Sequence, residues 1–350
     1  MASCDGYRNG EGPFEEMAGR LDISWRSCLR PRPILCIALL LQLCPSGRLV
    51  SQDVSSVLEF QYGVYGPSRG VIFRNPQGIA YERHRQEIYV ADTGNRNVSI
   101  FDSNGRHLFS FTYRVKTPSG ADVLAEPRSV AVDRDGFIYL TDAVSEAIQV
   151  RDPRGQSVAR IDLCEVLGTI GKKVIPEHLF IDSRGDLYVT TGGDVRELIV
   201  LDRNHKPVRR ISGTDKGYGA LSGVWVDEQG RIYLTDALNT PCVQVYDPDG
   251  AYRFGFGEKE IGDENFSLPH GIATTANGDI WVVDSIRQVV KRFDKEGRFL
   301  DMLGGFGINA GDLLYPMGVA GDGAGRLFVL ERVGSRYQSF RVKETEGVPN

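Results

Sequence analysis

One pattern of apolar and polar positions recurs six times along the chain. In each copy, a turn with proline or a small residue leads into an apolar strand. A Gly-centred hairpin follows, and then a second strand of the form Ile/Leu–aromatic–Val/Leu that usually ends in Asp. The copies begin at residues 75, 126, 175, 220, 268 and 315. A repeat of about 40 to 50 residues built from short strands is typical of a propeller. The pattern therefore predicts an all-β, six-bladed β-propeller.

The first copy predicts the four strands of a blade. Residues 78–81 form the expected inner strand and residues 87–92 the second strand. Residues 97–102 alternate polar and apolar side chains as a third strand, and residues 106–111 supply the outer strand. Ser103-Asn104-Gly105 joins the last two strands, because Asn and Gly adopt positive φ at little cost. We expect blades of four antiparallel strands.

The sixth copy is incomplete at its carboxyl end. After residues 337–342 the chain ends without an outer strand. A strand-like segment, residues 56–62, lies before the first copy. Pairing of this segment with the last blade would complete the ring and remove an exposed sheet edge. We expect an N-terminal strand to complete the last blade.

The first fifty residues differ from the rest. Arg26, Arg30 and Arg32 precede an apolar core at residues 34–43. This core is too short to span a bilayer, which needs about 20 residues. A charged flank followed by a short apolar core is typical of a secretory signal. We therefore interpret 1–50 as a leader that contains a signal peptide, and 51–350 as a single propeller without a transmembrane span.

Three alternatives for the leader stay open at this point. The apolar core could be a buried helix of the folded domain, and Met17 would give a leader of more usual length. Cys44 could carry a lipid, although Gln42 and Leu43 are an unfavourable context for lipid attachment. The predicted location is the periplasm or the extracellular space.

Charge and cysteine content narrow the function classes. A net charge of −5 makes a poor generic binder of phosphate backbones, so no nucleic-acid partner is expected. Of the six cysteines, only Cys164 and Cys242 lie in the repeats, and no Cys-x-x-Cys pair exists. The fold is therefore expected not to rely on disulfides, and the common zinc modules are excluded.

The repeats resemble the NHL-repeat propellers. The resemblance rests on residues 75–80 followed by 88–96, and on residues 254–257 followed by 268–273. It covers about residues 57–342 and implies a six-bladed propeller. It does not imply one activity, because the family includes scaffolds, RNA binders, sensor domains and a few enzymes. The third copy departs from the pattern, with Thr190-Thr191-Gly192-Gly193 at the end of its second strand and His178 in place of glycine.

Propeller geometry predicts a binding site at the mouth of the central channel. The residue after each entry proline, or its equivalent, should face this mouth. The six positions are mixed in chemistry, which suits a ligand site, although they could also simply fill and hydrate the channel. These residues are Gln77, Arg128, Glu177, Ser222, His270 and Met317.

The resemblance also implies two enzyme alternatives. NHL-type amidating lyases hold zinc with several channel histidines, and His270 stands at a matching position. Glu177 or His178 could join it, but no third imidazole is available, and catalytic zinc usually needs about three protein ligands. Gluconolactonase-like propellers hold a divalent ion with Glu, Asn and Asp, and no entry position here carries Asn. We therefore assign no catalytic residue and predict no cofactor, with a divalent metal as the alternative.

Carboxylates at the ends of the second strands have a structural interpretation. We expect them to accept N–H groups of the following loops. They are Asp92, Asp142, Asp236, Asp284 and Glu331.

The sequence thus predicts an exported NHL-repeat propeller that binds a protein, peptide or glycan on its loop face. The alternative is a metal-dependent propeller enzyme, amidating-lyase-like or gluconolactonase-like, that acts at the channel mouth. A third hypothesis is a subunit of an envelope complex. The protein is otherwise expected to be a monomer.

Overall fold

The computed structural model describes residues 57–343 except 118, 170 and 216. These residues belong to the second of two compact units, Val54–Asn350. The predicted leader at 1–50, with its apolar core at 34–43 and Cys44, lies outside the described residues. Among the residues described, no helix combines the length and apolar character that crossing a bilayer requires.

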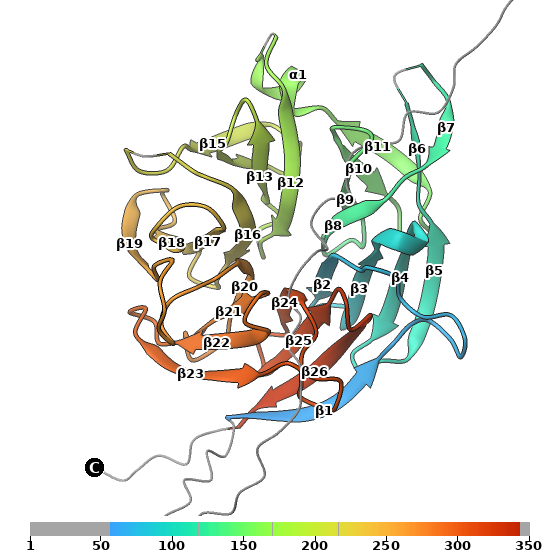
Figure 1. Ribbon diagram of the computed structural model, residues 1–350. Coiled ribbons are helices and arrows are strands. Elements are labelled where there is room, and N and C mark those ends of the chain that lie inside the picture. Colours follow the sequence, from blue (N-terminus) through green and yellow to red (C-terminus); the bar gives the residue numbers. More distant parts are fainter. Residues whose placement is uncertain (1–56, 118, 170, 216, 344–350) are drawn as a thin grey trace, which may run out of the picture. The chain divides into compact units, whose positions relative to one another are not determined.

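Six four-stranded antiparallel sheets form a ring, and a separate two-stranded sheet lies between blades 1 and 2 (Figure 1). Blade 1 comprises β2 (Gly78–Glu82), β3 (Glu87–Asp92), β4 (Asn97–Asp102) and β5 (His107–Thr112). Blade 2 comprises β8 (Pro127–Val132), β9 (Ile138–Asp142), β10 (Ile148–Arg151) and β11 (Ser157–Ile161). Blade 3 comprises β12 (Val174–Ile181), β13 (Leu187–Gly193), β14 (Leu198–Leu201) and β15 (Pro207–Ile211). Blade 4 comprises β16 (Leu221–Val226), β17 (Ile232–Asp236), β18 (Val243–Tyr246) and β19 (Tyr252–Phe256). Blade 5 comprises β20 (Pro269–Thr274), β21 (Ile280–Asp284), β22 (Val289–Phe293) and β23 (Phe299–Gly304). Blade 6 comprises β24 (Pro316–Gly321), β25 (Arg326–Glu331), β26 (Arg336–Val342) and β1 (Leu58–Val64).

The N-terminal strand closes the ring, as the sequence predicts. β1 pairs antiparallel with β26, from Leu58 opposite Val342 to Val64 opposite Tyr337. Figure 1 shows this pairing as the light-blue strand along the red one. The observed strand begins two residues later than the predicted segment and extends two residues beyond it. On the inner side, β24 of blade 6 contacts β2 of blade 1, so the ring is continuous.

The core lies between neighbouring blades. The second strand of a blade is covered by a blade on each side, so both of its faces are buried; every residue of β9 and β17 is buried. The outer strands have one solvated face and alternate instead, as in β23. Aromatic pairs join adjacent sheets, including Tyr81 with Phe328 at 5.3 Å between ring centroids. This packing explains why second strands are apolar runs while outer strands alternate.

The hairpins follow one rule. An Asp at the turn accepts the backbone N–H groups two and four residues later, and in most of these turns a glycine with positive φ stands three residues after it. At Asp133, for example, the N–H donors are Asp135 and Phe137, and Gly136 has φ of 87°. The same contacts occur at Asp102, Asp152, Asp182, Asp202, Asp227, Asp294 and Asp322.

The ring has two different faces. We call the "loop face" the side where the chain enters each inner strand and where the loops between second and third strands lie. The "hairpin face" is the opposite side, with the Asp-centred turns. Connections on the loop face carry the additional elements η1 (Thr93–Asn95), β6 (Arg114–Lys116), β7 (Asp122–Leu124) and α1 (Leu163–Leu167).

Candidate functional site

Five of the six predicted mouth residues line one small cavity in the central channel. Its volume is about 100 Å³. Sites for small organic ligands usually enclose about 300–1,000 Å³, so this cavity suits water or an ion better than an organic molecule. Its predicted lining residues are Gln77, Arg128, Ser222, His270 and Met317.

Glu177 does not line the cavity, and His178 takes its place. The Glu177 carboxylate lies against Gly192, where an added Cβ would come within 2.3 Å of Oε1. Burial raises the pKa of Glu177, while Arg128 and Arg196 act in the opposite direction. The glycine at 192 thus gives this carboxylate room to lie beside the second strand instead of facing the channel.

Two imidazoles face the channel in their neutral form. Burial lowers the pKa of His178 to about 4, with smaller contributions from His270 and Arg128. Burial also lowers the pKa of His270 to about 4, and its Nδ1 is buried without a hydrogen-bond partner. Neutral imidazoles can bind metal, but no group of three or more metal-ligating side chains occurs in the part of the chain that the structure describes. A divalent metal at His270, His178 and Glu177 stays a prediction.

The histidine pair predicts acid sensitivity. Both imidazoles titrate near 6.5 in the unfolded chain and near 4 in the folded one, so the unfolded state binds more protons between these values. Stability should be complete above about pH 6.5 and should fall as the pH approaches 4, by up to about 3 kcal/mol per histidine. Urea unfolding of wild type and of H178Q/H270Q, at about pH 7.5 and about pH 4.5, measures this difference.

The matched control is H84Q/H107Q, which removes two exposed histidines. We expect this control to lose as much stability on acidification as wild type does. We expect the stability of H178Q/H270Q to change little between the two pH values. Equal acid loss in all three proteins would show that the channel histidines do not cause it.

Hydroxyl groups fix the channel-facing residues. A Thr or Ser near the end of one blade's second strand donates to the carbonyl of an entry residue in the next blade. Thr93 Oγ1 donates to Pro127 O at 2.7 Å, and Thr235 Oγ1 to His270 O at 2.7 Å. In the same way, the Thr141 hydroxyl donates to the Glu177 carbonyl and the Ser285 hydroxyl donates to the Pro316 carbonyl. These bonds join adjacent blades, and the sequence pattern did not reveal them.

The strand-end carboxylates hold loops, and the predicted bonds from the following loop occur at Asp142, Asp236 and Asp284. At Asp92 and Glu331 the backbone donors are Arg74 and Leu314, in the loops before the inner strands. Asp236 accepts four backbone N–H groups, two from the loop before its blade's inner strand and two from the loop after its own strand. Asp142 accepts from Val144 and Ser145 N–H and from the Tyr113 hydroxyl. All five carboxylate residues are buried, so their role is structural.

Exposed apolar side chains distinguish the two faces. On the loop face, the second residue after the strand-end carboxylate is apolar and exposed in four blades, with Leu238 65% exposed. Other loops of this face add further exposed apolar residues. None of the exposed large apolar side chains of the described residues lies in the turns of the hairpin face. Those on the loop face are Tyr65, Val71, Ile72, Leu124, Val144, Leu238, Ile261, Ile286, Phe306, Ile308 and Val333.

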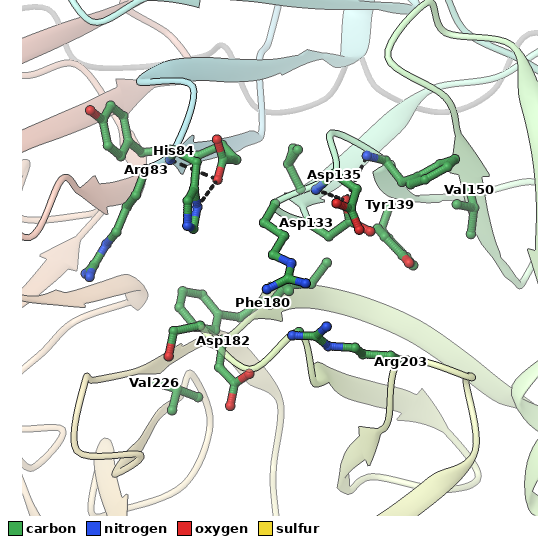
Figure 2. Close-up of a pocket in the computed structure, with 18 of the residues that line it drawn as sticks. Arg83, His84, Asp133, Asp135, Tyr139, Val150, Phe180, Asp182, Arg203 and Val226 are labelled. Atoms are coloured by element: carbon green, nitrogen blue, oxygen red, sulfur yellow. Dashed lines mark hydrogen bonds and ion pairs between the residues drawn. The ribbon is translucent and has the colours of Figure 1, made fainter.

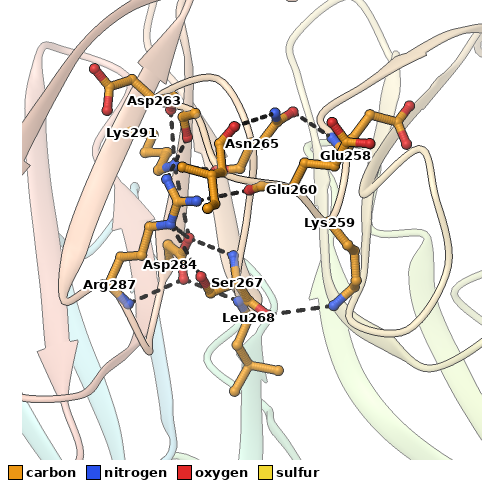
Figure 3. Close-up of polar contacts among 12 residues, drawn as sticks. Glu258, Lys259, Glu260, Asp263, Asn265, Ser267, Leu268, Asp284, Arg287 and Lys291 are labelled. Atoms are coloured by element: carbon orange, nitrogen blue, oxygen red, sulfur yellow. Dashed lines mark hydrogen bonds and ion pairs between the residues drawn. The ribbon is translucent and has the colours of Figure 1, made fainter.

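The loop that precedes β20 is held by one buried and one partly buried cation (Figure 3). Lys291 is fully buried and donates to the carbonyls of Asp263, at 2.8 Å, and Asn265. Arg287 donates to the carbonyls of Glu260, at 2.9 Å, and Gly262. Both cations also lie within 4 Å of the buried Asp284 carboxylate. The loop backbone is therefore fixed, while Ile261 at its tip is 100% exposed.

The loop that precedes β24 is fixed in the same way. Buried Arg336 pairs with Glu331 at 2.6 Å and donates to the carbonyls of Ile308, Asn309 and Asp312. This loop presents Phe306, 79% exposed, and Ile308. Two rigid loops thus hold apolar side chains in water over blades 5 and 6.

Comparison with known proteins identifies the repeat. No family model matches the chain. Mus musculus NHL repeat-containing protein 3 is 27% identical over 216 residues, which cover 56% of this chain and 58% of that protein. Mus musculus E3 ubiquitin-protein ligase TRIM32 is 26% identical over 306 residues, which cover 77% of this chain and 42% of that protein. The chain is an NHL-repeat propeller.

The NHL-repeat propeller shares its fold with proteins of unrelated sequence. A gluconolactonase from Xanthomonas campestris superposes with a TM-score of 0.54 at 16% identity, over 76% of this chain and 86% of that structure. At this identity the likeness shows the fold alone. The chain spans less than two thirds of the curated relatives it matches, so their activities are not transferred to it here.

Proposed function

We propose that this NHL-repeat propeller is a binding module that holds a protein partner on its loop face. The observation that carries the proposal concerns the connections between strands: those on the loop face carry exposed large apolar side chains, and the described turns of the hairpin face carry none. Contiguous exposed apolar surface mostly marks an interaction site in a soluble protein. The Asp-centred turns of the hairpin face provide an internal comparison, because none of the exposed large apolar side chains among the described residues lies in them.

The fixed backbone of the loops that carry exposed apolar side chains favours a protein partner over a glycan. Arg287, Lys291 and Arg336 fix the loops that carry Ile261 and Phe306, so little conformational entropy is lost when a partner binds. Aromatic and apolar side chains form the buried core of protein–protein interfaces, where a few of them carry much of the binding energy. A glycan would be met by polar side chains instead.

The relatives support a module that works within a larger assembly. The segment shared with TRIM32 covers 42% of that ligase. Export stays part of the proposal because of the charged flank and apolar core at residues 26–43. The protein would then meet its partner outside the cytoplasm.

The direct test removes three loop-face anchors at once. The variant L238S/I286S/V333S changes exposed residues in the loops of blades 4, 5 and 6. Each loss of an apolar contact is worth about 1 kcal/mol or more at an interface, so partner binding should weaken by about 100-fold. Quantitative pull-down from an extract of the source cells, with mass spectrometry, measures the change.

The matched control is L108S/V208S/L300S, which changes three exposed apolar residues on the outer strands β5, β15 and β23. Proteins retained by wild type and by this control, but lost with the loop-face variant, would support the proposal. Proteins retained equally by all three would contradict it.

A further inference from the structure

A second and larger cavity lies on the hairpin face, between blades 2 and 3 and extending to the ring axis (Figure 2). We call it the hairpin-face pocket. Its volume is about 390 Å³, within the range of about 300–1,000 Å³ typical of small-molecule sites. It lies on the opposite side of the ring from the entry residues and belongs to neither the predicted mouth site nor the loop-face surface.

The floor and one wall of this pocket are apolar and aromatic. Phe180 packs on Trp225 with 4.8 Å between ring centroids. Phe137, Val150 and Val158 add an aliphatic and aromatic side from blade 2. These groups come from three different blades, so together they form a concave surface that a flat apolar body could cover.

Three of the six acidic groups that line the pocket are paired with arginines within the protein. Asp227 pairs with Arg231 at 2.7 Å, and Glu228 pairs with Arg83 at 2.6 Å. Asp182 pairs with Arg184 at 2.9 Å.

Three further acids line the pocket. Glu82 is buried and accepts the backbone N–H groups of His84 and Arg85. Asp133 accepts two backbone N–H groups, and burial raises its pKa. Asp135 is the one lining carboxylate for which the described residues provide no hydrogen bond or ion pair.

The basic groups are left with free donors. Arg134 makes no hydrogen bond or ion pair with any residue that the structure describes, although it lines the pocket. Arg203 uses only Nε, which donates to the Arg184 carbonyl, so its terminal nitrogens are free. Figure 2 shows the Arg203 side chain extending toward Phe180. His205 adds a ring nitrogen 3.3 Å from the Tyr139 hydroxyl. Two guanidinium groups with free donors thus line the pocket, against one carboxylate, that of Asp135, without a hydrogen-bond partner among the described residues.

We propose that the hairpin-face pocket binds a small organic anion with an apolar or aromatic body. Arg134 and Arg203 would bind the anionic group, since guanidinium groups match carboxylate and phosphate geometry. The body would lie on Phe180 and Trp225. The site is independent of the loop-face partner, so the propeller would carry two different ligands on its two faces.

The probes are 2-naphthoate, 2-naphthyl phosphate and the neutral 2-naphthamide, which share one aromatic body. Calorimetry measures their affinity for the full chain, and amide NMR shifts locate the binding. We expect the anions to shift amides of residues 133–137, 181–185 and 203–205. We expect the neutral amide to bind about tenfold more weakly or worse. Tighter binding of the phosphate would indicate a phosphorylated natural ligand, and tighter binding of the carboxylate a carboxylic acid.

The variant R134Q/R203Q should weaken binding of both anions by about tenfold or more. Its control, R69Q/R154Q, removes two exposed arginines outside the pocket and leaves the same net charge. The proposal is overturned if naphthamide binds as tightly as naphthoate, if the two variants lose affinity equally, or if no probe binds at millimolar concentration. The comparison of probes on wild type does not depend on whether a variant folds.

Discussion

Deletion of residues 1–64 is expected to abolish cooperative folding of the propeller. This deletion removes β1, which is the outer strand of blade 6. The Phe60 ring packs on Phe340 at 6.1 Å between centroids, and the Tyr62 hydroxyl bonds the Ser103 carbonyl in blade 1. Without β1, the backbone groups of β26 become an open sheet edge. The lost pairing and burial are comparable with a typical total stability of about 5–15 kcal/mol.

The control is deletion of residues 1–53, which leaves β1 intact. Thermal unfolding by circular dichroism and size-exclusion chromatography compare the two proteins. The shorter chain should aggregate or show no cooperative transition, while the control should melt in one step. A monomeric 1–64 deletion that melts within a few degrees of the control would mean that β1 does not hold the ring closed.

The second large effect is expected for Asp284→Ala, because this carboxylate compensates two cations. Asp284 is fully buried and accepts the N–H groups of Ser267 and Leu268. Its oxygen lies 3.8 Å from Lys291 Nζ and 3.7 Å from Arg287 Nε. Burial, with a smaller contribution from Arg287, lowers the pKa of Lys291 to about 8, and Asp284 opposes the shift. Removing the carboxylate leaves buried charge uncompensated, so we expect a loss of about 3–5 kcal/mol in urea unfolding.

Asp236→Ala in blade 4 provides the matched control. Asp236 is also fully buried and accepts four backbone N–H groups, but it makes no ion pair within the described residues. We expect D284A to be the more destabilising of the two. The double variant D284N/K291M should recover part of the loss, because it removes a buried charge together with its partner. If D236A lowers the free energy of unfolding as much as D284A does, and the double variant recovers none of it, the uncompensated cations do not cause the loss.

The fold could be predicted because each blade repeats the same local signals. Proline entries, Asp-x-x-Gly turns and apolar second strands act within a few residues of one another, so the period and strand order are visible in sequence. Ring closure was also predictable, since the sixth copy lacks its outer strand and residues 56–62 can supply it.

The channel site was only partly predictable, because side-chain direction depends on contacts between strands. Glu177 occupies the expected sequence position, yet the space left by Gly192 accommodates its carboxylate. His178 lines the channel in its place. Four of the exposed apolar residues do have a sequence signal, because they are the second residue after a strand-end carboxylate: Val144, Leu238, Ile286 and Val333.

The hairpin-face pocket had no such signal. Phe180, Trp225, Arg134 and Arg203 are far apart in sequence and come from three blades. Which arginines remain unpaired depends on neighbouring acids that only the folded ring brings together. A cluster of this kind cannot be predicted from the sequence alone.

The loop-face claim is tested most directly by photo-crosslinking in the source cells. The photoreactive residue p-benzoylphenylalanine replaces Ile286 on the loop face, Val208 on an outer strand or Gln229 on the hairpin face, all exposed positions. The account predicts a crosslinked protein partner from position 286 and none from positions 208 and 229. A partner captured from position 229 or 208 but not from 286 would contradict it.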